Sequence, residues 1–267
     1  MADPFQDVDA AGADFIKVFA NAMDARQASP IMEQIVATYL AKLPITAESL
    51  IVEVGAGAGA VSRRIAAHAD PAHVIGFEPS EGFVREAKGR GSAHSNLRFE
   101  AADGTALPLE DCSVDHLIMH TVLTHVTDPK ALIHEAVRVL KPKGHLVVCD
   151  SDFSKATLSS FPNDPLDACA REFVTSFVTD PFIVAKLSPM LLEAGMTVTD
   201  FDMQSRVVAD GEQMLQWVTE TTKGMVARGD IGQPLADALV DEYHRRLKAG
   251  SLYGYQAFAT AIAQKAG

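Results

Sequence analysis

A short run of glycines follows the first strongly apolar segment of the chain and is its clearest chemical signal. The run reads EVGAGAGA over residues 53–60, and a helical pattern begins near Val61. Its glycines permit a tight turn and place no Cβ between the backbone N–H groups and a ligand. A carboxylate, Glu78, ends the next apolar run 23 residues after Gly55, where it can accept two hydrogen bonds from a ribose. Together these features predict a nucleoside-containing cofactor.

Two classes of cofactor fit this pattern, a dinucleotide and S-adenosylmethionine. Residues 55–60 satisfy the loose dinucleotide fingerprint, in which the last position is Ala. Glu53 favours S-adenosylmethionine, because a carboxylate is unfavourable beside a pyrophosphate and favourable beside an ammonium and a sulfonium. Asp103, just past the third apolar run, is placed to accept from an adenine amino group. A dehydrogenase of this kind would carry a Tyr-x-x-x-Lys pair, but Lys42 follows Tyr39 one residue too early.

Two histidines are candidates for moving a proton. If the cofactor is S-adenosylmethionine, it brings the reactivity for methyl transfer itself, but a hydroxyl or protonated amine acceptor also needs a base. His125 is the first candidate, because it follows the fourth apolar run near the expected cleft and an imidazole with an unperturbed pKa of roughly 6.5 suits this role. His120, which ends that run, is the second. Either ring could instead be packed in the core without a role in proton transfer.

Metal and disulfide chemistry are not predicted. His116 and His120 lie in a segment that reads as a strand, where residues four apart stand roughly 13 Å apart at ~3.3 Å per residue. Two ligands of one ion cannot be that distant. The three cysteines, Cys112, Cys149 and Cys169, form no C-x-x-C pair, so neither a zinc site nor a disulfide framework is indicated.

Charged and aromatic residues outside the glycine-rich half are weaker candidates for binding. Arg26 could pair with the carboxylate of the cofactor, although we favour a solvated surface charge. Asp150 and Asp152 could bind a polar acceptor, although helix capping is the favoured interpretation. Only three aromatic residues fall between residues 51 and 150. The remaining rings suit either helix–sheet packing or an aromatic-lined cap over a ligand cleft.

Apolar runs alternate with helical stretches between residues 50 and 150, which predicts βαβ units and a parallel sheet. Strands are expected at Leu50–Val54, His73–Phe77, Leu97–Ala101, Val114–Met119 and His145–Cys149. The clearest helix runs from Pro129 to about Leu140, with Asp128 as its N-cap. Further helices are expected within 13–43 (broken around Ser29–Pro30), 165–194 and 211–249. Met196–Val208 reads as a strand, whereas Tyr255–Gln264 fits a strand or a helix.

Composition and charge restrict the class of protein. The 267 residues are 48% hydrophobic and 22% charged, as in ordinary soluble globular domains. No apolar run approaches the ~18 residues of a membrane span, and the acidic start MADPFQDVDA resembles no secretory signal, so we expect a cytoplasmic protein. The net charge of −12 repels phosphate groups, so neither nucleic acid nor a membrane is an expected partner. A small-molecule acceptor is expected, and a homodimer is left open.

Four segments share their order and spacing with a known family. They read IVEVGAGAG (51–59), GFEPS (76–80), AADGTALPLEDCSVD (101–115) and DPKALIHEAVRVLKPKGHLVV (128–148). Together they resemble the class I S-adenosylmethionine-dependent methyltransferases, in particular the small-molecule branch similar to the ubiquinone and menaquinone methyltransferases. Many members carry Asp-x-Gly-Cys-Gly-x-Gly where this chain has Glu53 and Ala56, and both are tolerated variants.

The resemblance implies a Rossmann-like, doubly wound α/β fold with a seven-stranded sheet and an antiparallel last strand. It implies that the glycine-rich turn wraps the methionyl part of the cofactor, that Glu78 holds the ribose and that Asp103 holds the adenine amine. Residues 120–125 would line the cleft between cofactor and acceptor. The cofactor-binding residues expected on this basis are Arg26, Glu53, Gly55, Ala56, Gly57, Gly59, Glu78, Pro79, Ser80, Asp103, Gly104, Thr105 and His120.

We therefore expect one methyltransferase domain over residues 1–267. Its parts would be an N-terminal helical cap (1–48), a cofactor-binding core (49–150) and helical cap insertions (151–187 and 211–250). The predicted function is methyl transfer from S-adenosylmethionine to an apolar or aromatic small molecule, at oxygen, nitrogen or carbon, by in-line displacement with a histidine base where one is needed. The alternative is a cofactor-binding protein of the same fold that acts as a cyclase, a decarboxylase or a non-catalytic binding module.

Overall fold

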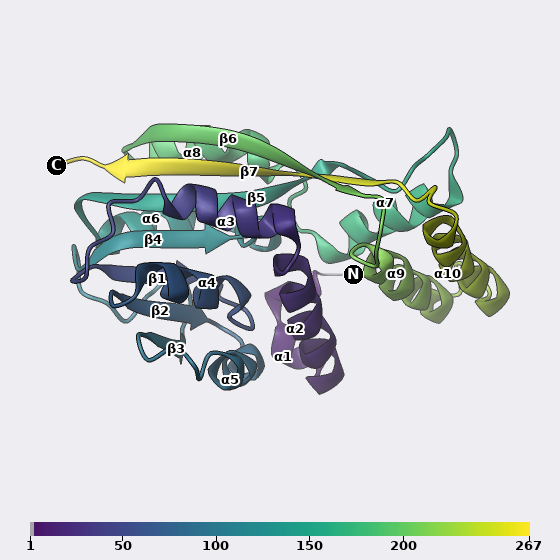
Figure 1. Ribbon diagram of the computed structural model, residues 1–267, viewed down its shortest axis with the longest axis horizontal. Helices are drawn as coiled ribbons and strands as arrows, with labels where there is room; N and C mark the ends of the chain where they lie inside the picture. Colours follow the sequence, from purple (N-terminus) through teal and green to yellow (C-terminus); the bar gives the residue numbers. More distant parts are fainter. Residues whose placement is uncertain (1–2) are drawn as a thin grey trace.

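The computed structural model describes residues 3–267, and a seven-stranded sheet runs through its centre (Figure 1). The strands are β1 (Leu50–Val54), β2 (His73–Glu78), β3 (Leu97–Ala101), β4 (Val114–His120), β5 (Leu140–Thr157), β6 (Met196–Val208) and β7 (Gly254–Lys265). Their order is β3-β2-β1-β4-β5-β7-β6. β1 to β5 pair in parallel, whereas β7 is antiparallel to β5 and to β6. The Rossmann-like sheet with an antiparallel last strand is confirmed, and the C-terminal run is a strand.

Helices cover both faces of this sheet (Figure 1). They are α1 (Val8–Ala11), α2 (Ala13–Gln27), α3 (Pro30–Leu40), α4 (Ala60–Ala69), α5 (Glu81–Arg90), α6 (Pro129–Val139), α7 (Pro165–Phe177), α8 (Ile183–Glu193), α9 (Leu215–Arg228) and α10 (Gln233–Lys248), with 3-10 turns at η1 (Pro4–Gln6) and η2 (Leu123–His125). Neighbouring residues of β1 pack into different cores, Ile51 with α3 and α4, and Val52 with α6 and α8. Strands covered on both faces are therefore almost wholly apolar. Within residues 3–267, no helix combines the length and apolarity that a bilayer crossing requires.

β5 is much longer than the predicted strand His145–Cys149. It begins at Leu140, which pairs with Val114 of β4, and from His145 to Thr157 it pairs with β7. Asp150 and Asp152 both lie in this strand, opposite Ala259 and Ala257, so the helix-capping role favoured for them is wrong. The local sequence does not show this extension, because the partner that pairs with it lies about a hundred residues later in the chain.

Two groups of helices lie beyond the carboxyl ends of the parallel strands (Figure 1). The first, which we call the cap helices, consists of α7, α9 and α10. These three helices share a small apolar core that includes Phe173, Trp217 and Tyr243. The second group is α1 and α2, which pack on α5 through Val8, Phe19 and other apolar residues. The end of the sheet that carries the glycine-rich turn is therefore covered from two sides.

Candidate functional site

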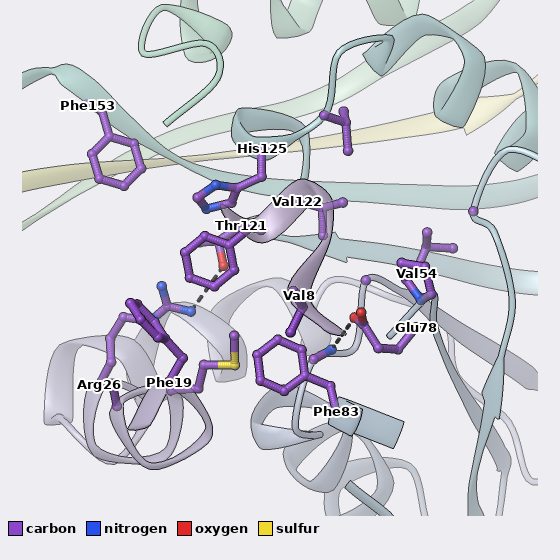
Figure 2. Close-up of a pocket in the computed structure, with 18 of the residues that line it drawn as sticks. Val8, Phe19, Arg26, Val54, Glu78, Phe83, Thr121, Val122, His125 and Phe153 are labelled. Atoms are coloured by element: carbon purple, nitrogen blue, oxygen red, sulfur yellow. Dashed lines mark hydrogen bonds between the residues drawn. The ribbon is translucent and has the colours of Figure 1, made fainter. Parts of the chain in front are cut away.

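A cavity of about 240 Å³ lies at the carboxyl ends of the parallel strands, between the sheet and the two groups of helices. Many of the predicted site residues line it, namely Arg26, Gly55, Gly57, Glu78, Pro79, Asp103, Gly104 and His125. Others do not line it, namely Glu53, Ala56, Gly59, Ser80, Thr105 and His120. Figure 2 shows several of the lining side chains converging on one space. The structure thus divides the predicted site residues into those that line the cavity and those that lie behind its surface.

The glycine-rich turn forms the edge of the cavity next to β1. Gly55 and Gly57 adopt left-handed φ angles of 71° and 52°. A Cβ at Gly55 would stand 2.5 Å from Val122 Cγ2, and one at Gly57 would stand 3.0 Å from Met23 Sδ. Glycine is therefore needed here both for the backbone conformation and for the close approach of neighbouring side chains. Ala56, by contrast, packs into a small cluster around Phe99.

Glu78 lies at the carboxyl end of β2, and two backbone groups hold its carboxylate. Its Oε2 accepts from the Gly57 N–H at 2.8 Å (Figure 2). Its Oε1 accepts from the Ser80 N–H at 3.0 Å. Burial raises the pKa of Glu78 to about 7, although both backbone donors act in the opposite direction. Each carboxylate oxygen has two lone pairs, so Glu78 can still accept from a ribose diol at the surface of the cavity. Ser80 therefore acts on the site through Glu78.

Asp103 is oriented in a similar way after β3. The Thr105 N–H and the Thr105 hydroxyl both donate to Asp103 Oδ1, each at 2.8 Å. Asp103 and Gly104 line the cavity, whereas Thr105 does not. The two bonds from Thr105 leave Asp103 Oδ2 able to accept from a ligand in the cavity.

Glu53 lies behind the glycine-rich turn, and its carboxyl group accepts from the Ser62 hydroxyl of α4. Burial, with a smaller contribution from the neighbouring Glu78, raises the pKa of Glu53 to about 8. A carboxyl group that is protonated at neutral pH loses little by its removal from water. The structure therefore places Glu53 in the support of the turn, outside the surface that a ligand touches.

Arg26 of α2 faces the cavity, so the surface charge favoured for it is wrong. Its Nη2 donates to Thr121 Oγ1 at 3.1 Å (Figure 2), and its Nε is buried with no partner. Burial lowers the pKa of this guanidinium. Thr121 itself has a φ of 56°, an uncommon value for a β-branched residue and one that concentrates at functional sites. Arg26 is thus a cation beside the cavity, and its Nε–H is still able to donate a hydrogen bond.

His125 also lines the cavity, and an acidic residue from the start of the chain contacts it. His125 Nδ1 lies 2.9 Å from Asp3 Oδ2, and the two rings of His125 and Phe5 are 4.6 Å apart. When Nδ1 donates to this carboxylate, Nε2 is the basic nitrogen of the neutral ring. Asp3 is a residue that sequence reasoning missed, because 122 positions separate it from His125.

His120 does not reach the cavity. Its ring is buried, with Nδ1 3.3 Å from the Tyr39 hydroxyl and Nε2 unpartnered. Burial, together with the positive charge of Arg26, lowers the pKa of His120 to about 3. An imidazole with so low a pKa is neutral at physiological pH and accepts a proton poorly from a substrate.

The part of the cavity under the cap helices contains residues with no motif in the sequence. The aromatic rings of Phe173 and Trp217 are stacked at 4.5 Å, and Phe153 lies 5.8 Å from Trp217. The cavity is also lined by four polar residues: Arg206, Gln213, Gln216 and Gln256. Both interpretations of the flanking aromatic residues therefore hold for these three rings, which belong to the core of the cap and also line the cavity.

Comparison with known proteins agrees with this geometry. Residues 52–148 match the family described as a methyltransferase domain. The chain is 36% identical to the demethylmenaquinone methyltransferase of Clavibacter sepedonicus over 115 residues, which are 43% of this chain and 46% of that protein. It is 30% identical to the demethylmenaquinone methyltransferase of Tropheryma whipplei (strain Twist) over 172 residues, which are 60% of this chain and 71% of that protein. The chain thus spans less than half of the first relative and more than two thirds of the second.

A solved structure extends the likeness to most of the fold. The YcgJ protein of Bacillus subtilis superposes with a TM-score of 0.61, covering 88% of this chain and 99% of that chain. The sequence identity between the two is 17%, so this likeness concerns the fold alone.

Proposed function

The chain belongs to the class I S-adenosylmethionine-dependent methyltransferases, and we propose that it transfers the methyl group of this cofactor to an aromatic small molecule. One observation carries the proposal. A single cavity is lined by Gly55, Glu78 and Asp103 at one part and by Phe153 and Trp217 at another. Figure 2 shows Glu78 and Phe153 on opposite sides of the view, with His125 and Thr121 between them. Such an arrangement supports two ligands that meet within one enclosed space.

The cofactor belongs in the part of the cavity beside the glycine-rich turn. Glu78 would accept from the ribose, Asp103 from the adenine amine, and Arg26 would pair with the methionyl carboxylate. The buried and unpartnered Nε of Arg26 supports this last assignment, because a donor left without a partner inside a protein is costly unless a ligand completes it. When bound, the cofactor supplies a methyl group that its sulfonium has already activated.

The protein itself contributes alignment and the exclusion of water. Orientation of two reactants supplies roughly 7–11 kcal/mol in the best cases. Phe5 and Phe19 from the N-terminal segment, with Phe153 and Phe173 from the other side, surround the space with apolar surface. Such surroundings shield a cationic sulfonium from competing water.

His125 is the base in this proposal whenever the accepting atom carries a proton. Nε2 of His125 would take the proton, while Asp3 holds Nδ1 and stabilises the imidazolium that forms. Asp3 is a positioning residue, because it acts through His125. An acceptor atom that bears no proton would need only the alignment.

We treat residues 1–267 as one methyltransferase domain. The cavity supports this view, because it is lined by Arg26 from 1–48, Glu78 from 49–150, Phe173 from 151–187 and Trp217 from 211–250. Each proposed part of the domain would then contribute directly to the site.

The experiment that tests the function measures S-adenosylhomocysteine by mass spectrometry. The purified protein is incubated with S-adenosylmethionine and a panel of phenols, aryl amines and their carboxylated derivatives. Formation of S-adenosylhomocysteine together with a methylated acceptor is the expected result. A protein that binds the cofactor but consumes none of it with any acceptor would instead act as a cyclase, a decarboxylase or a binding module.

A further inference from the structure

Arg206 of β6 carries a buried charge that the protein leaves without a counterion. The residue is 4% exposed. Its Nη2 donates to Gln256 Oε1 at 2.7 Å, and its Nε and Nη1 are buried with no partner. Across residues 3–267, no carboxylate lies within ion-pair distance of this guanidinium. The centroid of the Phe258 ring lies 6.0 Å from Arg206 Cζ.

A second buried arginine, Arg246, differs from Arg206 because its guanidinium is paired with carboxylates. Arg246 of α10 is 3% exposed, as deeply buried as Arg206. It donates to both oxygens of Asp164, at 2.6 and 2.9 Å, and to Glu242 at 2.6 Å. A buried charge without such compensation costs several kcal/mol. The unpaired state of Arg206 therefore indicates a charge kept for a ligand.

Three of the residues that line the cavity have buried polar atoms without a hydrogen-bond partner. Among the lining residues, the buried side-chain atoms without a partner are Nε of Arg26, Nε and Nη1 of Arg206, and Nε2 of Gln216. All of them are nitrogens that donate. The amide of Gln256 is held at both ends, because its oxygen accepts from Arg206 and its nitrogen donates to Ser151 Oγ at 2.7 Å. A ligand that satisfies this surface must offer acceptor atoms and a negative charge.

The same cavity is lined by aromatic residues. Phe173 and Trp217 are stacked, and Phe153 lies against Trp217. A cavity that offers both flat apolar surface and a cation suits a planar ring that bears an anionic substituent. Two cations are among the residues that line the cavity, Arg26 and Arg206. Burial lowers the pKa of Arg206 to about 10, and repulsion by the positive charge of Arg26 acts in the same direction. One anion for each would remove this repulsion, and the cofactor supplies one carboxylate.

We propose that the methyl acceptor is an aromatic molecule that carries a carboxylate, and that Arg206 binds this carboxylate while the ring packs against Trp217. This inference rests on the proposed function and assigns a substrate class to the same cavity. Arg26 is left for the carboxylate of the cofactor. Arg206 would thus determine which aromatic molecules are accepted, without taking part in the transfer itself.

Fluorescence offers a direct test, because Trp217 is the single tryptophan of the chain and lines the cavity. The protein is saturated with S-adenosylhomocysteine and titrated with 4-hydroxybenzoate or with its neutral isostere 4-hydroxybenzamide. We expect the carboxylate to bind at least tenfold more tightly than the amide. The Arg206→Met variant should lose this difference, whereas Arg206→Lys, which keeps the charge, should retain a preference for the carboxylate.

Two controls separate the possible failures. Thermal unfolding of the ligand-free variants should show that Arg206→Met is at least as stable as the wild type. Arg246→Met should unfold at a lower temperature, because it leaves the carboxylates of Asp164 and Glu242 without their partner. Calorimetry should give the same affinity for S-adenosylhomocysteine in the wild type and in Arg206→Met. A wild type that does not bind S-adenosylhomocysteine would overturn the proposed function as a whole.

Three results would overturn the substrate class alone. The first is equal binding, or no binding, of the two probes by the cofactor-loaded wild type. The second is a preference for the carboxylate that survives in Arg206→Met. The third is a tenfold loss of affinity for S-adenosylhomocysteine in Arg206→Met, which would assign Arg206 to the cofactor.

Discussion

His125 Nδ1 and Asp3 Oδ2 lie 2.9 Å apart, although one residue follows β4 and the other precedes the first helix of the chain. The Asp3 side chain is only 2% exposed, and it also accepts from the Phe5 N–H and from the Thr179 hydroxyl. The N-terminal segment is therefore tied to the edge of the cavity through one carboxylate. This contact orients the ring that we assign as the base.

Replacement of His125 by Ala should lower the turnover number by ~10²–10⁴, the usual share of general-base catalysis, if the acceptor is a hydroxyl. Affinity for S-adenosylhomocysteine should stay unchanged, because the proposed cofactor contacts lie on other residues. The measurement is single-turnover methylation across pH, and the matched control is His134→Ala, at an exposed histidine of α6. Identical pH profiles for wild type and His125→Ala would remove His125 from the mechanism.

Replacement of Asp3 by Asn should preserve the shape of the pair and still reduce turnover by about tenfold or more. The Asn oxygen can accept from the Phe5 N–H as before, which turns the amide nitrogen toward His125. A donor at that position places the ring proton on Nε2, the wrong tautomer for a base. The reduction should appear in kcat with KM for the cofactor unchanged. An unaltered kcat would mean that Asp3 only anchors the chain.

Affinity for S-adenosylhomocysteine should fall as the pH drops from 8 to 6. The pKa of Glu78 is raised to about 7 by burial, so this change protonates a carboxylate that would accept from the ribose. Glu78→Gln should abolish the dependence on pH, and Glu78→Ala should weaken binding at least tenfold, since hydrogen bonds to a charged partner contribute ~1.5–3 kcal/mol each. Calorimetric titration at several pH values measures both effects. The same slope in Glu78→Gln as in wild type would place the ribose elsewhere.

Glu53 should make the folded protein less stable in alkaline solution. Its pKa is raised from 4.5 to about 8 in the folded state, so the folded state binds a proton that the unfolded chain has lost. The contribution of the Glu53 carboxyl group to the free energy of unfolding is fully present below pH 4.5. It is lost as the pH rises through 8. Urea unfolding at pH 6 and pH 9 should show a smaller loss in Glu53→Gln than in wild type. The exposed Glu110→Gln should behave as wild type, and an equal loss in both variants would contradict the assignment.

The parts of the site that were predicted from the sequence lie close together along the chain. Gly55, Glu78 and Asp103 each follow a strand of successive βαβ units, so their shared edge of the sheet follows from topology. The position of Arg26 in the site could not be predicted in this way. Its helix α2 presents Phe19, Ala22, Met23 and Arg26 to the cavity on one face, but the sequence of a helix does not show which face a distant loop will cover.

The residues that sequence reasoning missed depend on pairing between remote segments. Arg206 meets Gln256 because β6 and β7 pair in antiparallel register. Asp3 meets His125 because the N-terminal segment contacts η2, the turn that follows β4. The position of His120 at the end of a strand predicts a place in the cleft, yet its ring packs against Tyr39 of α3. Neighbouring residues of a strand point to opposite faces, and only the packed helices show which face is open.

Calorimetric titration with S-adenosylhomocysteine and with NADH shows whether this cavity holds S-adenosylmethionine. We expect saturable binding of S-adenosylhomocysteine at one site per chain, weakened at least tenfold in Glu78→Ala, and no binding of NADH. Tight binding of NADH together with no binding of S-adenosylhomocysteine would contradict it.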